Sequence, residues 1–264
     1  MQAMPGYDAP GLVELLRTSR RAVAFTGAGI STESGIPDFR SPGGVWTRYD
    51  PSEYTFDRYV ASAQVRANSW AMRREFFAHN AQPNAAHRAL AQLEEAGHAA
   101  GVITQNIDGL HQLAGSSPVV EVHGTAREVM CIGLAPRDGT PDGCGFTAPY
   151  TWGEEQVEAG DPDPHCPVCG GLVKSATVSF GQMLFPGVVQ QAVELVSAAD
   201  LVIAVGSSLQ VFPAADLPVQ GVKAGAALVI INDEPTPLDG IADLVVRGRA
   251  AEVLGPAVAE ALES

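Results

Sequence analysis

The sequence of 264 residues predicts an α/β fold: a doubly wound parallel sheet with a small inserted zinc-binding module and a helical and loop insertion. Two observations predict the sheet. Runs of Val, Ile and Ala recur along the chain, and amphipathic helical patterns separate several of them. Such continuous apolar runs are typical of parallel strands covered on both faces. A third observation predicts the module, because all four cysteines lie between residues 131 and 169.

The expected strands are bounded by Gly, Asn or Asp and lie at 21–27, 99–106, 199–208, 226–233 and 242–248. The helical patterns between them lie at 11–20, 84–97 and 187–199. The sheet-forming part is therefore expected at about 10–35, 81–125 and 175–262. Two segments interrupt this pattern. One is 36–80, with a polar and aromatic helical stretch at 67–77, and the other is 126–174, which is rich in Gly, Pro and Asp.

Charge and hydropathy exclude several classes of protein. The formal net charge of -14 argues against direct nucleic-acid binding, which needs clustered Lys and Arg, and favours a basic peptide or protein partner. The first eleven residues contain no basic segment followed by an apolar one, and no window approaches the roughly 20 apolar residues of a membrane span. We therefore expect a cytoplasmic protein that does not contact a membrane.

Gly, Ser, Asn and acidic residues follow the expected strands, at 27–31, 105–108, 206–208 and 231–234. In an open parallel sheet, ligands bind at the carboxyl ends of the strands. Glycine lets backbone amides approach a pyrophosphate, Ser and Asn donate hydrogen bonds, and acids accept them from ribose hydroxyls. These segments predict a dinucleotide pocket. Thr32 stands where a dehydrogenase would have its third glycine, so a tight strand-to-helix turn remains an alternative for the first loop.

Two further motifs carry candidate catalytic groups. Asn106 and Asp108 lie just beyond a strand, and a helix is expected to begin at 107 or 108, so Asp108 is either a helix cap or a site residue. The Gln-Asn pair that precedes it favours a site. His123 follows a short apolar strand and precedes Gly124, the usual place for a general base, whereas the other five histidines lie in helical, loop or cysteine-module patterns.

The cysteines predict a structural zinc site. Cys166 and Cys169 have the spacing of a knuckle that presents two thiolates to one tetrahedral ion, whereas Cys131 and Cys144 are more widely spaced. A module this poor in apolar residues needs a bound metal ion or a covalent cross-link in order to fold. The alternatives are that Cys131 is buried filler and Cys144 a loop thiol, or that Cys166 and Cys169 form a redox dithiol.

Taken in order, the stretches "GAGISTESGIPDFRS", "TQNIDGLHQLAG", "EVHG", the cysteine module, "VSFGQ", "VGSSLQVFPAADLP" and "INDEPT" resemble the sirtuins of bacterial type, a family of NAD-dependent protein deacylases. The resemblance covers roughly residues 10–262. It implies one catalytic domain over 1–264 with a Rossmann-like part, a flexible cofactor loop and helical insertion at about 36–80, and a zinc module at about 126–174. NAD would bind in the cleft between them.

The resemblance also implies roles for individual residues. The catalytic residues would be His123, Asn106 and Asp108, with nicotinamide held between 106–108 and a mobile flap at 35–40. Glu33 is expected to have only a local structural role near the helix start. The implied NAD-binding residues are Gly27, Ala28, Gly29, Ser31, Ile36, Asp38, Phe39, Arg40, Gln105, Asn106, Ile107, Asp108, Gly206, Ser207, Ser208, Asn232, Asp233, Glu234 and Ala250.

In the implied reaction, the acyl oxygen of a modified lysine attacks the ribose carbon as nicotinamide leaves, and His123 then deprotonates the ribose hydroxyls. The products would be free lysine, nicotinamide and O-acyl-ADP-ribose, so NAD is consumed. The acylated peptide would add as a strand between 179–182 and 209–213. The implied substrate residues are Trp70, Arg73, Val178, Phe180, Gly181, Val211 and Phe212.

Three features depart from the family pattern. The first cysteine pair is spread apart, Gln182 stands where many relatives have Glu, and Trp70 replaces the Tyr of the Tyr-x-x-Arg pair that grips acidic acyl groups in desuccinylases. We therefore expect a preference for acetyl and similar neutral acyl groups. The alternatives are desuccinylase or demalonylase specificity through Arg73, and a packing role for Trp70 and Arg73 outside the pocket. For the whole chain, the alternatives are protein mono-ADP-ribosyl transfer and a non-catalytic NAD sensor.

Overall fold

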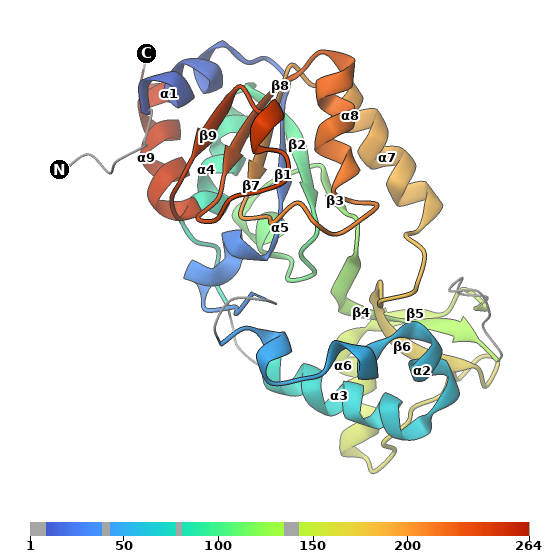
Figure 1. Cartoon of the computed structure of the whole chain (residues 1–264). Helices are drawn as coiled ribbons and strands as arrows, with labels where there is room; N and C mark the ends of the chain where they lie inside the picture. Colours follow the sequence, from blue (N-terminus) through green and yellow to red (C-terminus); the bar gives the residue numbers. More distant parts are fainter. Residues whose placement is uncertain (1–8, 39–42, 78–80, 135–142, 264) are drawn as a thin grey trace.

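The larger part of the molecule is a six-stranded parallel sheet, seen in the upper half of Figure 1. In a computed structural model that describes residues 9–38, 43–77, 81–134 and 143–263, its strands lie in the order β3-β2-β1-β7-β8-β9. Their bounds are Ala22–Thr26 (β1), Ala99–Thr104 (β2), Val119–Glu121 (β3), Leu201–Val205 (β7), Ala227–Ile231 (β8) and Leu244–Val246 (β9). The predicted doubly wound parallel sheet is confirmed.

Helices cover both faces of this sheet, so its strands consist mainly of apolar residues. Ala22 and Ala24 of β1 enter a core with α1 (Ala9–Thr18), α4 (Ala85–Glu95) and α9 (Ala250–Leu262). Val23 and Phe25 face the other way and pack with α7 (Pro186–Ser197) and α8 (Asp216–Ala224). Successive side chains of a strand point to opposite faces, so one apolar run fills two cores.

The strand order reverses between β1 and β7, and the site is built around this point. The chain runs from β1 outward to β3 and later returns to β7 on the other side of β1. The 3₁₀ helix η1 (Ala28–Ser34) follows β1, and α5 (Leu110–Ala114) follows β2. The latter helix begins later than the expected 107–108, because Asp108 Oδ1 accepts the N–H of Leu110 and Gly109 has a φ of +74°.

The smaller part, called the small domain below, comprises residues 45–77, 124–134 and 143–177. Its antiparallel sheet has the order β5-β4-β6, with β4 (Gly124–Gly133), β5 (Thr147–Pro149) and β6 (Leu172–Thr177). The helices are α2 (Phe56–Ala61), α3 (Ala63–Phe77) and α6 (Tyr150–Glu158), with the short 3₁₀ turns η2 (Val45–Thr47) and η3 (Pro51–Tyr54). Figure 1 shows α2, α3 and α6 gathered around this sheet, whereas the last 3₁₀ turn, η4 (Asp239–Ile241), belongs to the large domain.

The helical insertion and the cysteine module share their cores. Phe56 and Tyr59 of α2 pack with Ile132 and Leu172 of the sheet. Trp70 of α3 packs in a second cluster with Val129, Cys131, Cys166 and Val173. Segments that are far apart in sequence therefore form one folding unit. None of the helices in the described part of the chain combines the length and apolarity needed to cross a bilayer.

Candidate functional site

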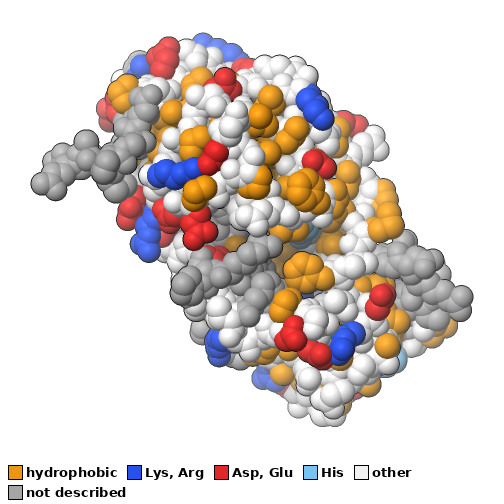
Figure 2. Space-filling model, in the orientation of Figure 1, with side chains coloured by type: hydrophobic (Ala, Val, Ile, Leu, Met, Phe, Trp, Pro, Cys, Tyr) orange, Lys and Arg blue, Asp and Glu red, His pale blue; other side chains and the backbone are white. Residues whose placement is uncertain are grey.

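A cavity of about 580 Å³ lies between the carboxyl edge of the parallel sheet and the small domain. Every predicted catalytic, cofactor and substrate residue that the structure describes lines this cavity. Phe39 and Arg40 lie outside the described residues. Figure 2 shows the surface hollowed between the two parts of the molecule, with hydrophobic side chains around the hollow. The fold therefore brings together segments that the sequence spreads over 27–250.

The glycine loops after β1 and β7 pack directly on each other. The N–H of Gly29 donates to the carbonyl of Gly206 across 2.8 Å. A Cβ on Gly206 would lie 2.3 Å from the backbone nitrogen of Ile30, and the φ of Gly206 is +58°. A Cβ on Gly27 or Gly29 would lie 2.8 Å from the Gly206 carbonyl oxygen. Only glycine fits these close approaches, so backbone rather than side chains forms the wall of the cavity here.

Asn106, Ser31 and Asp108 form a hydrogen-bonded group at the adjoining strand end. Asn106 Nδ2 donates to the carbonyl of Gly27 at 3.1 Å and to Ser31 Oγ at 3.0 Å. Ser31 Oγ donates in turn to Asp108 Oδ2 at 2.7 Å. Oδ1 of Asp108 accepts the N–H of Leu110, the first residue of α5, so one carboxylate oxygen is used at the start of the helix and the other bonds Ser31 at the cavity.

Two buried histidines outside the predicted site residues, His87 and His111, support this group. The N–H of Asn84 donates to His87 Nδ1 at 3.3 Å, so the ring hydrogen is on Nε2, which lies 3.5 Å from Ser31 Oγ. Burial lowers the pKa of His87 to about 4, and it lowers the pKa of its neighbour His111 to about 3. Both rings are neutral at pH 7. Asn84, three residues before His87 at the start of a helix, was the available signal, because it forms a capping box with it.

His123 has one ring nitrogen fixed and lines the cavity. Its Nδ1 lies 3.1 Å from the carbonyl oxygen of Gln105, and because a carbonyl only accepts, Nδ1 carries the hydrogen. Burial lowers the pKa of His123 below its ordinary value. The neutral ring therefore has its lone pair on Nε2. Gln105 also donates from Nε2 to Ser207 Oγ at 2.8 Å, which joins the loops after β2 and β7.

The segment 178–182 connects the two domains beside His123. The N–H of Val178 donates to the His123 carbonyl at 2.8 Å, and the carbonyl of Phe180 accepts from the N–H of Phe56 at 2.8 Å. Gln182 closes a turn by accepting, at Oε1, from the N–H of Ser179 at 3.1 Å. Gly181, the residue before Gln182, has a φ of +78°. Phe180 and, on the facing loop, Phe212 are exposed at 45% and 68%, and Val211 also lines the cavity.

Trp70 and Arg73 form a packed wall of the cavity on the side of the small domain. Trp70 is 3% exposed, its ring is stacked on Tyr150 at 5.5 Å, and a Cβ on Gly153 would lie 2.6 Å from its indole. Arg73 Nη2 donates to Thr177 Oγ1 at 2.7 Å. Both residues are packed, but both line the cavity, so the alternative that they lie outside the pocket is wrong.

Glu33 connects the first loop to the last helix. Its Oε2 accepts the N–H of Ala251, at 2.9 Å, in the first turn of α9. The role is not the local one that was expected, because the two residues lie 218 positions apart in sequence. A carboxylate is favourable at a helix N-terminus. The remaining predicted cofactor residues on the cavity wall are Ala28, Ile36, Asp38, Ile107, Ser208, Asn232, Asp233, Glu234 and Ala250.

The four cysteines converge in the small domain. Their sulfur atoms all lie within 4.8 Å of one another, with Cys131 and Cys169 at 3.6 Å and Cys144 and Cys166 also at 3.6 Å. Tetrahedral zinc with Zn–S bonds of about 2.3 Å needs sulfur atoms about 3.8 Å apart, so the donors fit a structural zinc ion. Cys131 and Cys144 are not isolated thiols. These two contacts join Cys131 and Cys144 to the Cys166–Cys169 pair, which argues against a separate dithiol at Cys166 and Cys169.

Comparison with known proteins agrees with this geometry. The model of the Sir2 family matches residues 27–213. The chain is 48% identical over 253 residues to NAD-dependent protein deacetylase 1 of Bradyrhizobium diazoefficiens, covering 94% of each chain. It is 47% identical over 235 residues to NAD-dependent protein deacetylase 2 of Streptomyces coelicolor, covering 87% of this chain and 93% of the relative.

Solved structures similar to this chain are also Sir2 enzymes. A Sir2 enzyme solved to explain the mechanism and regulation of these enzymes has a TM-score of 0.84 at 40% identity, covering 96% of this chain and 97% of its own. Sir2 bound to a p53 peptide and NAD+ has a TM-score of 0.84 at 37% identity, and Sir2Tm bound to a propionylated peptide has 0.84 at 36%; both cover 98% of this chain and all of their own. The chain belongs to the Sir2 family, the sirtuins.

Proposed function

We propose that this chain removes acyl groups, foremost acetyl, from protein lysines, transferring them to ADP-ribose from NAD with release of nicotinamide. Membership of the Sir2 family and the deacetylases among its relatives support this activity. The observation that carries the assignment of residues is that His123, Asn106 and Asp108 line one cavity together with the glycine loops and the 178–182 segment.

The carboxyl edge of the parallel sheet suits the dinucleotide. NAD supplies the bond between nicotinamide and ribose that the reaction breaks. Gly27, Gly29 and Gly206 line the cavity and have no side chains, so a pyrophosphate can approach these loops closely. We assign the adenosine and phosphates to these loops, with 232–234 and Ala250, and the nicotinamide end to 105–108 with Ile36 and Asp38.

His123 is assigned as the general base that takes a proton from a ribose hydroxyl. Its Nδ1–H is held by the Gln105 carbonyl, so Nε2 is the basic nitrogen. Burial keeps the ring neutral at pH 7, and a base must be unprotonated to act. Asn106 and Asp108 are assigned to orient the reacting end of NAD, since both are held by Ser31.

The acylated substrate is assigned to the groove between 179–182 and 209–213. Val178 and Phe180 already use backbone groups to bond His123 and Phe56, so we expect a peptide strand at the opposite edge. Main-chain pairing of this kind is indifferent to sequence. The exposed rings of Phe180 and Phe212 are suited to flank the aliphatic stem of the lysine. The peptide complexes among the solved relatives support a peptide substrate.

The acyl pocket is assigned to the wall formed by Trp70 and Arg73. Trp70 has no phenolic hydroxyl, and its indole is fixed between Gly153 and Tyr150. Arg73 already donates to Thr177. We therefore assign a preference for acetyl over succinyl. The zinc ion would be held by Cys131, Cys144, Cys166 and Cys169; four thiolates leave it no open position, so its role is structural.

One assay tests both the reaction and the acyl preference. A peptide carrying acetyl-lysine or succinyl-lysine is incubated with and without NAD, and the products are identified by mass spectrometry. We expect NAD-dependent free lysine and O-acetyl-ADP-ribose, with the larger kcat/KM for acetyl. A larger kcat/KM for succinyl would overturn the acyl assignment. With labelled NAD, label bound covalently to protein without deacylation would instead indicate ADP-ribosyl transfer.

A further inference from the structure

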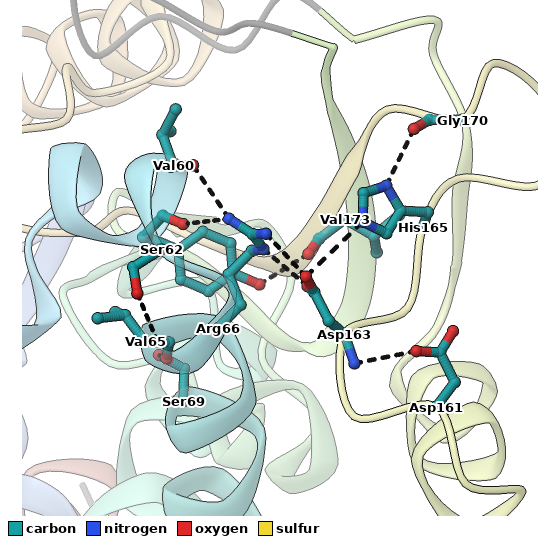
Figure 3. A network of polar contacts seen from close by, with 11 residues as sticks. Val60, Ser62, Val65, Arg66, Ser69, Asp161, Asp163, His165, Gly170 and Val173 are labelled. Carbon is teal, nitrogen blue, oxygen red and sulfur yellow. Dashed lines mark hydrogen bonds and ion pairs between the residues drawn. The ribbon is translucent and has the colours of Figure 1, made fainter.

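Arg66 is a buried cation that joins three segments of the small domain (Figure 3). The residue is 7% exposed. Its Nε and Nη2 each donate to one carboxylate oxygen of Asp163, both at 2.7 Å. Nη1 donates to the carbonyls of Tyr59 and Val60, each at 3.0 Å, in the last turn of α2. The guanidinium therefore holds α2, α3 and the loop around Asp163 in one fixed geometry.

Asp163 belongs to the loop that leads into the cysteine knuckle. Its N–H donates to Asp161 Oδ1 at 3.1 Å. His165, whose Nε2 lies 3.7 Å from Asp163 Oδ2, is bonded through Nδ1 to the carbonyl of Gly170, just after the last cysteine. Figure 3 shows these residues as one continuous network. The position of Asp163 is thus set by the metal-binding part of the small domain.

Arg66 and the two acyl-wall residues lie on the same face of α3. Trp70 follows Arg66 by four residues and Arg73 follows it by seven, so the three side chains are stacked along one side of the helix. Trp70 packs on Val129 and Val173, and Tyr59 Oη donates to the carbonyl of Val173 at 2.7 Å. The apolar contacts of α3 are not directional. A bidentate ion pair adds a directional contact that specifies the geometry of the helix.

We propose that the Arg66–Asp163 ion pair determines acyl specificity by fixing the position of α3, and with it the pocket wall formed by Trp70 and Arg73. Arg66 is a positioning residue and does not touch the substrate. The proposal rests on the deacylase function. It extends that function by giving the loop that carries Asp163, just before the cysteine knuckle, a role in selecting the length of the acyl group.

The test replaces both partners so that no lone charge is left buried. In Arg66→Met with Asp163→Leu, the helix keeps its apolar contacts but loses its fixed geometry. The matched control is Arg74→Met with Glu158→Leu, because this pair joins α3 to α6, at 3.1 Å, but has side chains that are 45% and 62% exposed. The readout is the ratio of kcat/KM for an acetyl-lysine peptide to that for the same peptide carrying butyryl-lysine.

We expect this ratio to fall about tenfold in the buried-pair variant, the scale at which a hydrophobic pocket discriminates methylenes. In the control the ratio should stay at the parent value, and the KM for NAD should not change in either variant. An unchanged ratio, with both substrates losing activity equally, would show that the pair contributes only stability. If the double variant does not fold, Arg66→Lys is used, because it keeps the positive charge but cannot form the bidentate contact with Asp163. A ratio of acetyl to butyryl kcat/KM equal to that of the parent in Arg66→Lys would overturn the proposal.

A second readout does not depend on turnover. In protein labelled with 5-fluorotryptophan, the Trp70 resonance is assigned by Trp70→Phe. It is expected to shift or broaden in the buried-pair variant and to stay in place in the control. A parent protein that deacylates no lysine peptide would refute the proposed function. A Trp70 resonance that does not move in the buried-pair variant would refute the coupling of Arg66 to the acyl wall.

Discussion

His123 donates from Nδ1 to the carbonyl oxygen of Gln105 across 3.1 Å, so the chain that holds the ring also fixes its tautomer. Burial lowers the pKa of His123, so the ring stays neutral at pH values where a free imidazole is partly protonated. We expect kcat/KM to decrease with falling pH only below about pH 6.5, the ordinary pKa of His. A fall centred above that value would contradict this role for the ring.

Replacing the base should separate catalysis from binding. In His123→Ala we expect turnover to fall by about 10²- to 10⁴-fold, the usual contribution of a positioned base. NAD affinity, measured by calorimetry, should remain, because the glycine loops are untouched. Undiminished turnover would remove His123 from the mechanism, and loss of NAD binding would show that it is mainly structural.

Gly206→Ala should damage the cofactor site through the backbone. The new Cβ would lie 2.3 Å from the Ile30 nitrogen, so the loops after β1 and β7 must separate, and we expect the KM for NAD to rise. The control is Gly225→Ala, where φ is also positive but no atom lies within 4 Å. Both variants carry backbone strain of roughly 1–2 kcal/mol. Equal KM values for NAD in the two variants would argue against loop packing as the cause.

Removal of zinc should loosen the small domain and leave the parallel sheet folded. Cys131 and Cys166 belong to a core that is separate from the two cores of the large sheet. In Cys144→Ser we expect zinc content to fall, with hydrogen exchange accelerated in β4 and β6 and unchanged in β1 and β7. Equal acceleration in both sheets would show that the two domains unfold together.

Lys174 should make stability depend on pH in the alkaline range. It is 2% exposed, its ammonium donates to the carbonyls of Ser175 and Thr177 and to Gln182 Oε1, and burial followed by repulsion from Arg73 lowers its pKa to about 7. Between pH 7 and 10.5 the unfolded chain therefore binds more protons than the folded one, so the free energy of unfolding rises with pH.

Gln182→Glu tests this dependence, because a carboxylate beside the ammonium would raise the pKa of Lys174. We expect a higher melting temperature at pH 7 and a flatter profile up to pH 10 than in the parent. Lys223→Met, at a residue outside the buried core, should leave the profile unchanged. If Gln182→Glu lowers the melting temperature at pH 7, the Lys174 ammonium is not the origin of the slope.

Much of the site follows from local sequence because of strand geometry. Parallel strands end at one edge, so Gly27, Asn106 and Gly206 could be assigned to one pocket from their places after apolar runs. Cys144 could be placed in the zinc site only as a hypothesis, since nothing local specifies which thiols meet. The structure places their sulfur atoms 3.6 Å apart.

Other features depend on contacts between distant segments and leave no local pattern. Arg66 and Asp163 lie 97 residues apart, and each alone reads as a surface charge. Glu33 meets α9 from the other end of the chain. His87 was passed over because it lies within an ordinary amphipathic helix, and its contact with Ser31 arises only when that helix packs against the first loop.

His123 bonds to its surroundings in two separable ways, by its ring to Gln105 and by its main-chain carbonyl to Val178. The second bond does not depend on the side chain and survives in His123→Ala. An inactive variant should therefore keep the edge on which an acylated segment would dock. Such a protein, loaded with NAD, would serve as a trap that retains its targets, and the acylated lysines it captures could be read directly by peptide sequencing.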